Sequence, residues 1–499
     1  MVTSLHTSGF PASAPFRLLL GSEPARHSKS SAAQVSLLLI AIIALGLSAC
    51  SVGPNYHRPP LDVPAEFRNA PPSVDTNSLG ELPWWDVFKD PLLQDLLRTA
   101  LTNKYDLRVA VARVEQARAI LIENRALFFP QIGYSGEAAR GRNAAGGTLL
   151  YNQGTTTSTF AAAANASWEI DLWGRIRRLN EAARAQYLAS REARHDVTVS
   201  IISQVAQAYF RLLAIDEQLA IARSSTNAFG ESYRIFSQRL EQGVVSKLET
   251  SAALAALASA AATVPEYERQ IVIQENLINV LVGRNPGPVA RHRTLLAENL
   301  ALSIQPGLPS SLVERRPDIR EAEANLRAAN ADVGVAVANF FPQLSLTGLF
   351  GQVSPELSAF TSGGATAWSA AANLAGPLFQ GGRLIGQYRQ ARAVREEVRW
   401  RYQQTVLNAF EEVANALISL QKYGEERVQQ IRAVDAYQVA VQVSMERYIA
   451  GRASYYEVLQ EQQQLYPAEN SRVQIELNQC LAFIQLYAAL GGGYVVSNQ

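Results

Sequence analysis

The stretch Gly174–Gln242 reads GRIRRLNEAARAQYLASREARHDVTVSIISQVAQAYFRLLAIDEQLAIARSSTNAFGESYRIFSQRLEQ and contains no proline. Ala, Arg, Glu, Gln and Leu dominate it, so its summed helix propensity is high. Apolar residues recur at steps of three and four, at Val197, Ile201, Val205, Ala208, Leu212, Ile215, Leu219 and Ala222. This spacing is close to the 3.5-residue period of a coiled-coil face. The pattern predicts a helix about 100 Å long, which needs partners along its whole length to bury that face.

The chain carries this kind of stretch twice. Gly382–Ala450 has the same length and character, with apolar positions at Val406, Phe410, Val413, Leu417 and Leu420. The copies also end alike, in Arg239-Leu-Glu-Gln-Gly243 and in Arg447-Tyr-Ile-Ala-Gly451, and a new helical pattern follows each glycine. A long-period duplication of this kind indicates two copies of one structural unit.

Each long helical stretch is preceded by two segments with a different period. Apolar and polar residues alternate in four segments, at residues 131–140, 160–172, 343–350 and 367–378. A period of two indicates strands with one apolar face. Their length and terminal aromatic residues are typical of strands in a membrane β-barrel. A soluble hairpin with one buried face remains the alternative for the first pair.

Four membrane strands do not close a barrel. An open sheet edge in lipid leaves backbone groups without hydrogen bonds, and single-chain barrels begin at about eight strands. The sequence therefore predicts that several copies assemble and that each contributes a sector of the barrel. The fold class that follows is mainly α with a small membrane β-barrel sector, internally duplicated, with four strands per chain.

The N-terminus carries an export signal. Arg26 and Lys29 precede the apolar run at residues 35–47, which is too short for a membrane span and ends in Leu47-Ser48-Ala49-Cys50. Such a run is typical of a signal peptide, here residues 1–49. Small residues followed by cysteine resemble a bacterial lipobox, so Cys50 is the expected lipidated first residue. An ordinary signal peptide with a chance cysteine is the alternative.

The remaining boundaries follow from composition and from the duplication. Residues 50–82 are rich in Pro, Asn and Ser, and we expect an extended, lipidated tether that packs on nothing. The first structural repeat spans residues 83–287 and the second spans residues 310–494. Residues 288–309 link them, and residues 495–499 form a short tail.

Composition excludes several classes of function. The formal net charge is +1, so nothing indicates a nucleic-acid partner. The five histidines are scattered and form no ligand-spaced cluster. We find no nucleophile elbow, phosphate loop or close pair of acids in a plausible pocket. The sequence therefore predicts neither an enzyme nor a cofactor or metal site.

Together these features resemble the TolC-type outer-membrane factor family, in its lipoprotein branch that serves resistance–nodulation–division (RND) efflux pumps. The residues that carry the resemblance are Leu47–Cys50, Trp84-Trp85, Asp90-Pro91, Phe129-Pro130, Trp168–Arg175, Arg315–Ile319, Phe341-Pro342 and the two turns after the long helices. The resemblance implies a homotrimer whose barrel of about twelve strands continues into a coiled-coil tunnel. It also implies a location in the outer membrane, with the tunnel in the periplasm. The expected function is a passive efflux duct that docks on a periplasmic adaptor and an inner-membrane RND transporter.

The resemblance places the functional positions at the two turns. Gly243, Val244 and Val245, with Gly451, Arg452 and Ala453, match the turns where adaptor hairpins seat. Tyr456, Glu457 and Gln460 match the segment that constricts the closed tunnel, and Arg452 is a candidate partner for a salt bridge that holds it shut. Three copies of Glu457 around a narrow tube would form a cation-selective ring. The alternative is that Glu457 is a solvated residue on a helix face.

Two other functions stay open at this point. One is the tunnel of a type I protein secretion system, against which the lipobox favours efflux. The other is a structural coiled-coil lipoprotein without a pore, which would leave the four alternating strands unexplained.

Overall fold

The computed structural model describes residues 51–70, 78–142, 156–291, 294–295 and 306–494. The chain divides into two compact units, Met1–Cys50 and Ser51–Gln499, and all that follows concerns the second. The predicted signal peptide, Cys50 and the tail at residues 495–499 lie outside the described residues. So do residues 143–155, which connect the first two strands, and most of the predicted linker.

The two long helices are present as predicted. Helix α5 spans Arg175–Glu241 and helix α9 spans Arg383–Ile449, and each has 67 residues. Most of the predicted apolar positions are buried, including Ile201, Val205 and Leu212 in α5. A glycine in the left-handed region precedes each helix, with φ of 81° at Gly174 and 87° at Gly382.

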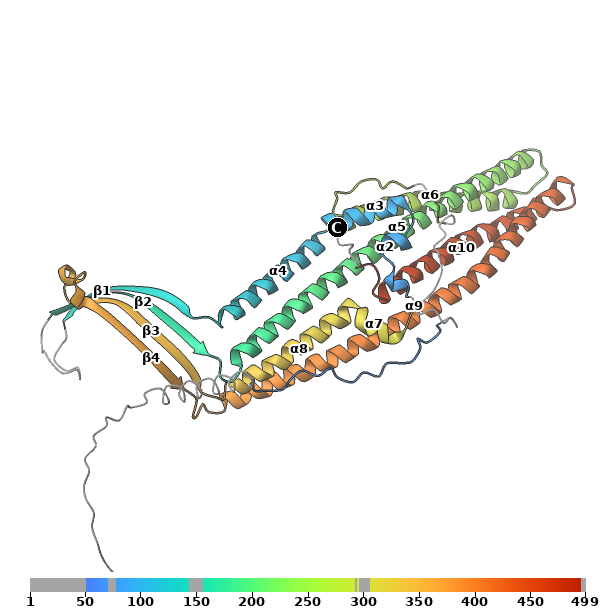
Figure 1. Cartoon of the computed structure of the whole chain (residues 1–499). Helices are drawn as coiled ribbons and strands as arrows, with labels where there is room; N and C mark the ends of the chain where they lie inside the picture. The colour runs from blue at the N-terminus through green and yellow to red at the C-terminus, as the bar shows by residue number, and fades with distance from the viewer. Residues whose placement is uncertain (1–50, 71–77, 143–155, 292–293, 296–305, 495–499) are drawn as a thin grey trace, which may run out of the picture. The chain divides into compact units, whose positions relative to one another are not determined.

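Four further helices pack along these two (Figure 1). They are α4 (Tyr105–Ala126), α6 (Lys247–Leu281), α8 (Pro317–Ala338) and α10 (Tyr455–Ala489). Helix α5 contacts all four of them, and α9 contacts α8 and α10. The apolar positions of the long helices thus receive the partners that their length demands.

The largest apolar core, here called the central core, surrounds the middle of α5 and the end of α10. Short helices cover it: α2 (Trp84–Val87), α3 (Pro91–Asn103) and α7 (Pro309–Arg315). Its fully buried large side chains include Phe88, Leu97, Tyr209, Phe210, Leu213, Phe483 and Tyr487. Two of its buried hydroxyls have partners: Tyr209 donates to the Asp90 carboxylate, and Tyr487 donates to the Leu82 carbonyl at 2.6 Å. Asp90 also caps α3 by accepting from the Leu92 amide.

The four predicted strands form one antiparallel sheet in the order β1-β2-β3-β4. Strand β1 spans Gln131–Arg142, β2 Thr156–Ile170, β3 Gln343–Ser354 and β4 Thr366–Ala375. Strand β2 stops before the predicted residue 172, because the Leu172 amide turns back to the Ile170 carbonyl. Strand β4 stops before residue 378, because Pro377 has no amide hydrogen to donate.

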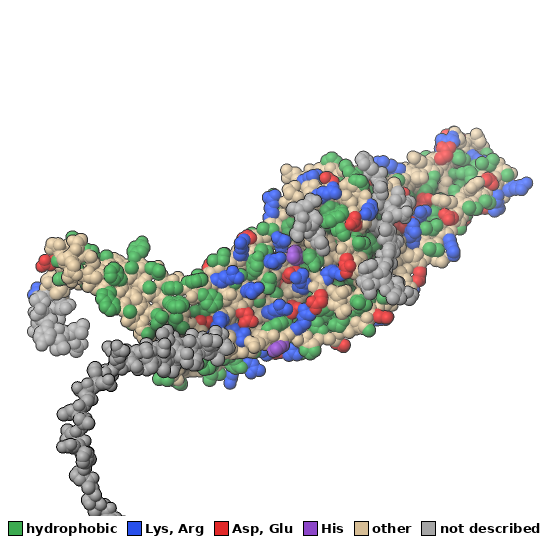
Figure 2. Space-filling model, in the orientation of Figure 1, with side chains coloured by type: hydrophobic (Ala, Val, Ile, Leu, Met, Phe, Trp, Pro, Cys, Tyr) green, Lys and Arg blue, Asp and Glu red, His purple; other side chains and the backbone are tan. Residues whose placement is uncertain are grey.

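The register places the alternating apolar residues on one face. Tyr134, Ala164, Phe350 and Trp368 pair in a row across all four strands, and the next row opposes Ile132, Ala166, Gly348 and Ala370. Tyr134 is 93% exposed and Trp368 is 74% exposed, so the described chain leaves this face uncovered. Figure 2 shows few charged side chains over the strands and many over the helices. Within the described residues, β1 and β4 each pair on one side only.

The junction between sheet and helices brings two of the family-like motifs together. Trp173 stacks on Phe341 with 4.7 Å between ring centroids. Its indole nitrogen donates to the Pro342 carbonyl at 2.8 Å. These contacts tie the end of the first repeat's strand pair to the start of the second pair.

The expectation of a loose tether is wrong for residues 51–70, which we call the N-terminal strap. Arg178 of α5 is 3% exposed and donates to the carbonyls of Val52 and Gly53 and to the Asn55 side chain, at 3.2, 3.3 and 2.8 Å. A Cβ on Gly53 would lie only 2.5 Å from the Gly334 Cα in α8, so the backbones meet without side chains.

The rest of the strap packs as well. Arg58 pairs with Glu314 and Glu323, and Phe67 packs against Phe410 of α9. The composition of the strap correctly indicated an extended backbone. It gave no sign of the partners in α5, α7, α8 and α9 that hold this backbone in place.

Candidate functional site

The turns after the two long helices have the same geometry. Gly243 and Gly451 follow α5 and α9 with φ of 73° and 69°. In the first turn the Gly243 amide donates to the Leu240 carbonyl and the Val244 amide donates to the Arg239 carbonyl, both at 2.9 Å. The second turn repeats both bonds. This pattern is a Schellman motif, which uses a left-handed glycine to satisfy the last carbonyls of a helix. We call the two turns and their flanking helix ends the helix tips.

The helices that leave the tips begin differently. Helix α6 starts with a capping box, in which the Ser246 amide donates to Glu249 at 2.7 Å and the Glu249 amide donates to Ser246 at 3.4 Å. Glu457 occupies the matching position at the start of α10. It pairs instead with Arg447 at 3.3 Å, and the Ser454 side chain makes no cap bond.

The four predicted gate residues gather at the second helix tip. Tyr456 is 58% exposed, Gln460 is exposed beside it one helical turn later, and Glu457 is half-buried. Arg452, the expected partner of Glu457, is exposed and forms no ion pair within the part of the chain that the structure describes. Within the single chain, Glu457 therefore forms its ion pair with Arg447. The sequence analysis did not single out Arg447.

Sequence reasoning also missed Tyr455. Its side chain is 4% exposed, and its hydroxyl lies 2.7 Å from the Ser232 hydroxyl of α5. Its ring packs edge-on against Phe236 at 5.0 Å and Tyr448 at 4.8 Å. Burial raises the pKa of the Tyr455 hydroxyl.

Tyr455 belongs to a second, separate apolar core that joins the two hairpins. Its buried members are Phe236, Ala253, Tyr455 and Val458, from α5, α6 and α10, and Tyr448 packs against them. We call this set the tip core. The Arg239 guanidinium lies over the Tyr448 ring at 4.6 Å from its centroid and adds a cation–π contact between α5 and α9.

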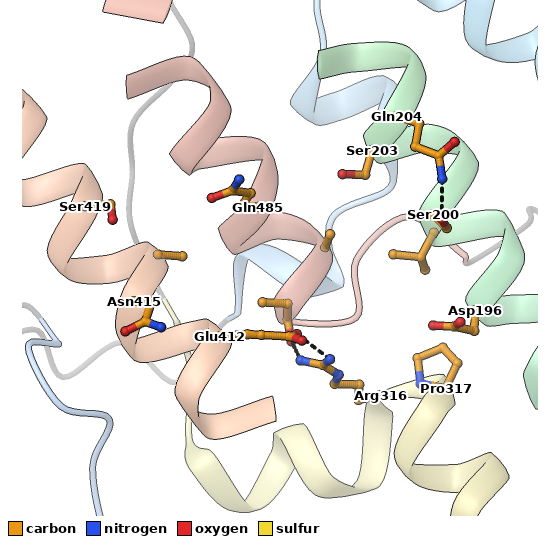
Figure 3. Close-up of a pocket in the computed structure, with 14 residues that line it drawn as sticks. Asp196, Ser200, Ser203, Gln204, Arg316, Pro317, Glu412, Asn415, Ser419 and Gln485 are labelled. Atoms are coloured by element: carbon orange, nitrogen blue, oxygen red, sulfur yellow. Dashed lines mark hydrogen bonds and ion pairs between the residues drawn. The ribbon is translucent and has the colours of Figure 1, made fainter. Parts of the chain in front are cut away.

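A polar recess of about 520 Å³ lies away from the tips, where the start of α8 meets the end of α10 (Figure 3). Arg316 donates to Asp318 at 2.8 Å and to the Ala489 carbonyl at 3.0 Å, and it pairs with Glu412 of α9. Asp196 of α5 lies beside Pro317 on the other side of the recess.

Two carboxyl groups near the start of α8 have raised pKa values: Asp196, which lines the recess, and Glu321, which does not. Burial, with Asp318 nearby, raises the pKa of Asp196. Burial, with Asp196 and Asp318 nearby, raises the pKa of Glu321 from 4.5 to about 6. The lining carries serine, asparagine and glutamine side chains and no histidine or cysteine. Two carboxylates, Asp196 and Glu412, face one cation, Arg316, across a polar lining.

Comparison with known proteins identifies this architecture. The family described as "Outer membrane efflux protein" matches residues 96–284 and 308–492, which is most of the chain. The chain belongs to the outer membrane efflux protein family. It is 33% identical over 464 residues to the probable efflux pump outer membrane protein TtgC of Pseudomonas putida, covering 92% of this chain and 96% of TtgC.

A second relative and a solved structure agree with this assignment. The cation efflux system protein CusC of Escherichia coli is 31% identical over 464 residues, covering 91% of this chain and 99% of CusC. The open-state crystal structure of the Neisseria gonorrhoeae MtrE outer membrane channel superposes with a TM-score of 0.82 at 29% identity, covering 89% of this chain and 99% of MtrE. As a member of the outer membrane efflux protein family, the chain is a channel protein of the outer membrane.

Proposed function

We propose that three copies of this chain form the exit duct of a tripartite efflux pump. Each copy supplies four strands, so three copies close a barrel of about twelve strands. The long helices then continue the barrel as a periplasmic tunnel. Solutes pass through the duct without any chemical step on the protein.

The uncovered sheet is the observation that carries this proposal. Its two outer strands each have a free edge, and its apolar face is exposed in the single chain. An exposed apolar face is unfavourable in water, and strand edges without hydrogen-bond partners are unfavourable in water and in lipid. A closed barrel whose apolar face meets lipid removes both problems. A coiled-coil scaffold without a pore would have no use for this sheet.

The partners follow from the family and from the helix tips. TtgC and CusC are named as components of efflux systems. We propose that a periplasmic adaptor seats on the exposed turns Gly243–Val245 and Gly451–Ala453, and that an RND transporter feeds the duct through it. Cys50 is proposed to carry the lipid anchor. Efflux is favoured over type I protein secretion because these relatives are efflux components.

The gate is proposed to lie at the second helix tip. Tyr456 and Gln460 are exposed on one side of α10, and Glu457 lies on the flank of that side. Threefold symmetry would bring three copies of this face together. Three Glu457 carboxylates in a narrow ring favour cations, and three tyrosines reduce the free diameter.

Three measurements on the purified, lipid-reconstituted protein and one in cells test the proposal. Native mass spectrometry should give three copies, and the mature N-terminus should be a diacylglycerol-bearing Cys50. Planar bilayers should show discrete conductance steps. In cells that lack their own efflux channel, the chain with its cognate adaptor and transporter should lower the accumulation of a fluorescent dye. A monomer or dimer that forms pores would overturn the proposed assembly, and a trimer without conductance would overturn the duct.

A further inference from the structure

Strand β1 ends in two arginines on the same face as the apolar residues of the sheet. Every residue of β1 pairs with one residue of β2, so no bulge interrupts the alternation of its side chains. Arg140 and Arg142 therefore lie on the face of Tyr134, and both are exposed. Because β1 starts just after α4 and Arg142 is its last residue, the pair lies at the end of the sheet away from the helices. In the proposed barrel this end is the outer rim, on the side that meets lipid.

The register places the two arginines just beyond the apolar band of this face. On β2 the large apolar residues of the face run from Ile170 to Phe160, which are ten positions apart. At about 3.4 Å per residue this is a length of about 34 Å, and a strand tilt of about 40° reduces it to a height of about 26 Å, which matches the band of membrane barrels. Arg140 pairs with Ser158, the next residue outward on this face, and Arg142 pairs with Thr156. The guanidinium groups therefore reach the layer of the lipid head groups.

No carboxylate of the chain neutralises this pair. Neither arginine forms an ion pair or a side-chain hydrogen bond with any residue that the structure describes. Residues 138–168, which include the connection between β1 and β2, contain no Asp or Glu. Glu137 and Glu169 flank this stretch, but their positions in the register place them on the opposite, polar face. Two cations without a carboxylate on a rim that meets lipid attract an anion from outside the chain.

The strand pairs themselves do not require these arginines. They are the only basic residues in the sequence of residues 131–170 and 343–378, and the matching positions of the second repeat hold Gln352 and Ser354. The single acidic residue of 343–378 is Glu356, which follows β3. Strand β4 separates β3 from the sheet edge that a neighbouring copy would pair with. Each copy in a trimer thus presents one arginine pair on a rim with few other charges.

The chemistry of the pair fits a phosphate group. A guanidinium presents a planar fork of donors that matches the oxygens of a phosphate. The hydroxyls of Ser158 and Thr156, the two residues paired with the arginines, add donors of the kind that phosphate oxygens accept. A phosphomonoester carries about −1.5 to −2 charges at neutral pH, which two arginines balance, whereas the phosphodiester of a phospholipid carries a single charge.

We propose that Arg140 and Arg142 bind a phosphomonoester of a glycolipid in the outer leaflet, at one site on each copy of the chain. The site ties the rim of the barrel to the head groups that surround it. This inference rests on the proposed function, because only a closed barrel places this face in lipid.

Native mass spectrometry of the trimer in mild detergent tests the site. The probe is hexa-acylated lipid A with two phosphates, and EDTA is present throughout so that no divalent cation bridges phosphate and protein. The wild type should bind three copies of the lipid, and the double variant Arg140→Gln, Arg142→Gln should bind them about tenfold more weakly. Dephosphorylated lipid A and phosphatidylglycerol should bind both proteins equally and weakly.

Two controls separate the site from the overall charge of the protein. Glu137→Gln removes a carboxylate from the opposite face of the same strand. The double variant Arg234→Gln, Arg269→Gln removes two exposed cations from α5 and α6, each of which pairs with a glutamate of its own helix. Both controls should bind lipid A with the affinity of the wild type. Weaker binding by the second control would show that net charge decides, which overturns the site.

Three further outcomes also decide the proposal. Wild-type affinity in the double variant Arg140→Gln, Arg142→Gln would overturn it, and so would phosphatidylglycerol binding as tightly as lipid A. If that variant does not assemble, Arg140→Lys, Arg142→Lys keeps the charges and loses the forks, and it should bind lipid A several-fold more weakly than the wild type. If the wild type is not a trimer, the proposed assembly fails, and the same titration of the species that forms still shows whether the arginines bind the lipid.

Discussion

The guanidinium of Arg239 lies over the ring of Tyr448, 4.6 Å from its centroid, and so joins the last turn of α5 to the last turn of α9. The two residues sit next to the two turn glycines, Gly243 and Gly451. The matching arginine of the second repeat, Arg447, makes a different contact, an ion pair with Glu457. The two tips thus share a backbone geometry, but the arginine contacts an aromatic ring in the first tip and a carboxylate in the second.

Loss of the Arg239–Tyr448 contact should loosen the link between the hairpins. A cation–π contact at a partly exposed site contributes about 0.5–2 kcal/mol, so Arg239→Gln and Tyr448→Leu should each raise the frequency of channel opening several-fold. Single-channel recording measures this. Lys247→Gln removes an exposed cation of the first tip and is the control, which we expect to behave as wild type. Equal opening of Arg239→Gln and wild type would mean that the contact does not restrain the tips.

The gate residues of the second tip should respond separately. Tyr456→Ala should raise single-channel conductance, because it widens the proposed constriction. Glu457→Gln should weaken block by millimolar divalent cations, because it removes the proposed ring of carboxylates and the ion pair with Arg447. Neither change touches the tip core, so trimer stability should be unaltered. If conductance and block both stay at the wild-type level, the constriction lies elsewhere.

The N-terminal strap should depend on Arg178. Arg178→Met keeps the volume of the buried side chain but removes the donors to Val52, Gly53 and Asn55. Each lost hydrogen bond to these partly exposed acceptors costs about 1 kcal/mol, and the three are lost together, so we expect the strap to detach. Limited proteolysis should then cut within residues 51–70 much faster than in wild type. Arg184→Met removes an exposed arginine of the same helix and should leave the strap protected.

Periodicity was enough to predict the elements of this fold. Apolar residues recur at steps of three and four in α5 and at every second position in β2, and each pattern marks a face that must be buried or meet lipid. The second repeat carries the same two patterns, which supported the assignment of a helix and of strands. The ends of strands were harder to predict, because they depend on single backbone bonds such as that of the Leu172 amide. The packing of the strap was not predictable from its composition, since its partners, Arg178 and Gly334, lie far away in the sequence.

At the tips the sequence located the turns and missed the contacts. Gly243 and Gly451 are visible as helix-ending glycines because a Schellman motif requires a left-handed residue there. Tyr455 is buried and Tyr456 is exposed, but both are tyrosines, so residue type cannot tell which of the two is buried. Only the crossing of α10 with α5 decides which ring turns inward toward Ser232 and Phe236.

The partly buried carboxyl of Glu321, in the first turns of α8, should make stability depend on pH. Burial and the nearby Asp196 and Asp318 raise the pKa of Glu321 to about 6 in the folded protein, from 4.5 when unfolded. The protonated form is therefore favoured in the folded state. The unfolding free energy should fall as pH rises from about 4.5 to about 6, and the loss should then remain at higher pH. A shift of this size corresponds to at most about 2 kcal/mol, and to about 1 kcal/mol for a side chain that retains contact with water.

Glu321→Gln removes the titrating group and keeps its shape. The variant should melt at a higher temperature than wild type at pH 7.5, at nearly the same temperature at pH 4.5, and with a flatter profile between them. Glu123→Gln neutralises an exposed carboxyl of α4 and serves as the control, for which we expect the wild-type profile. Thermal melting of the reconstituted protein between pH 4.5 and pH 7.5 gives the measurement. Parallel profiles for Glu321→Gln and wild type would show that the trimer hydrates or neutralises this carboxyl, and that Asp196 and Asp318 do not act on it.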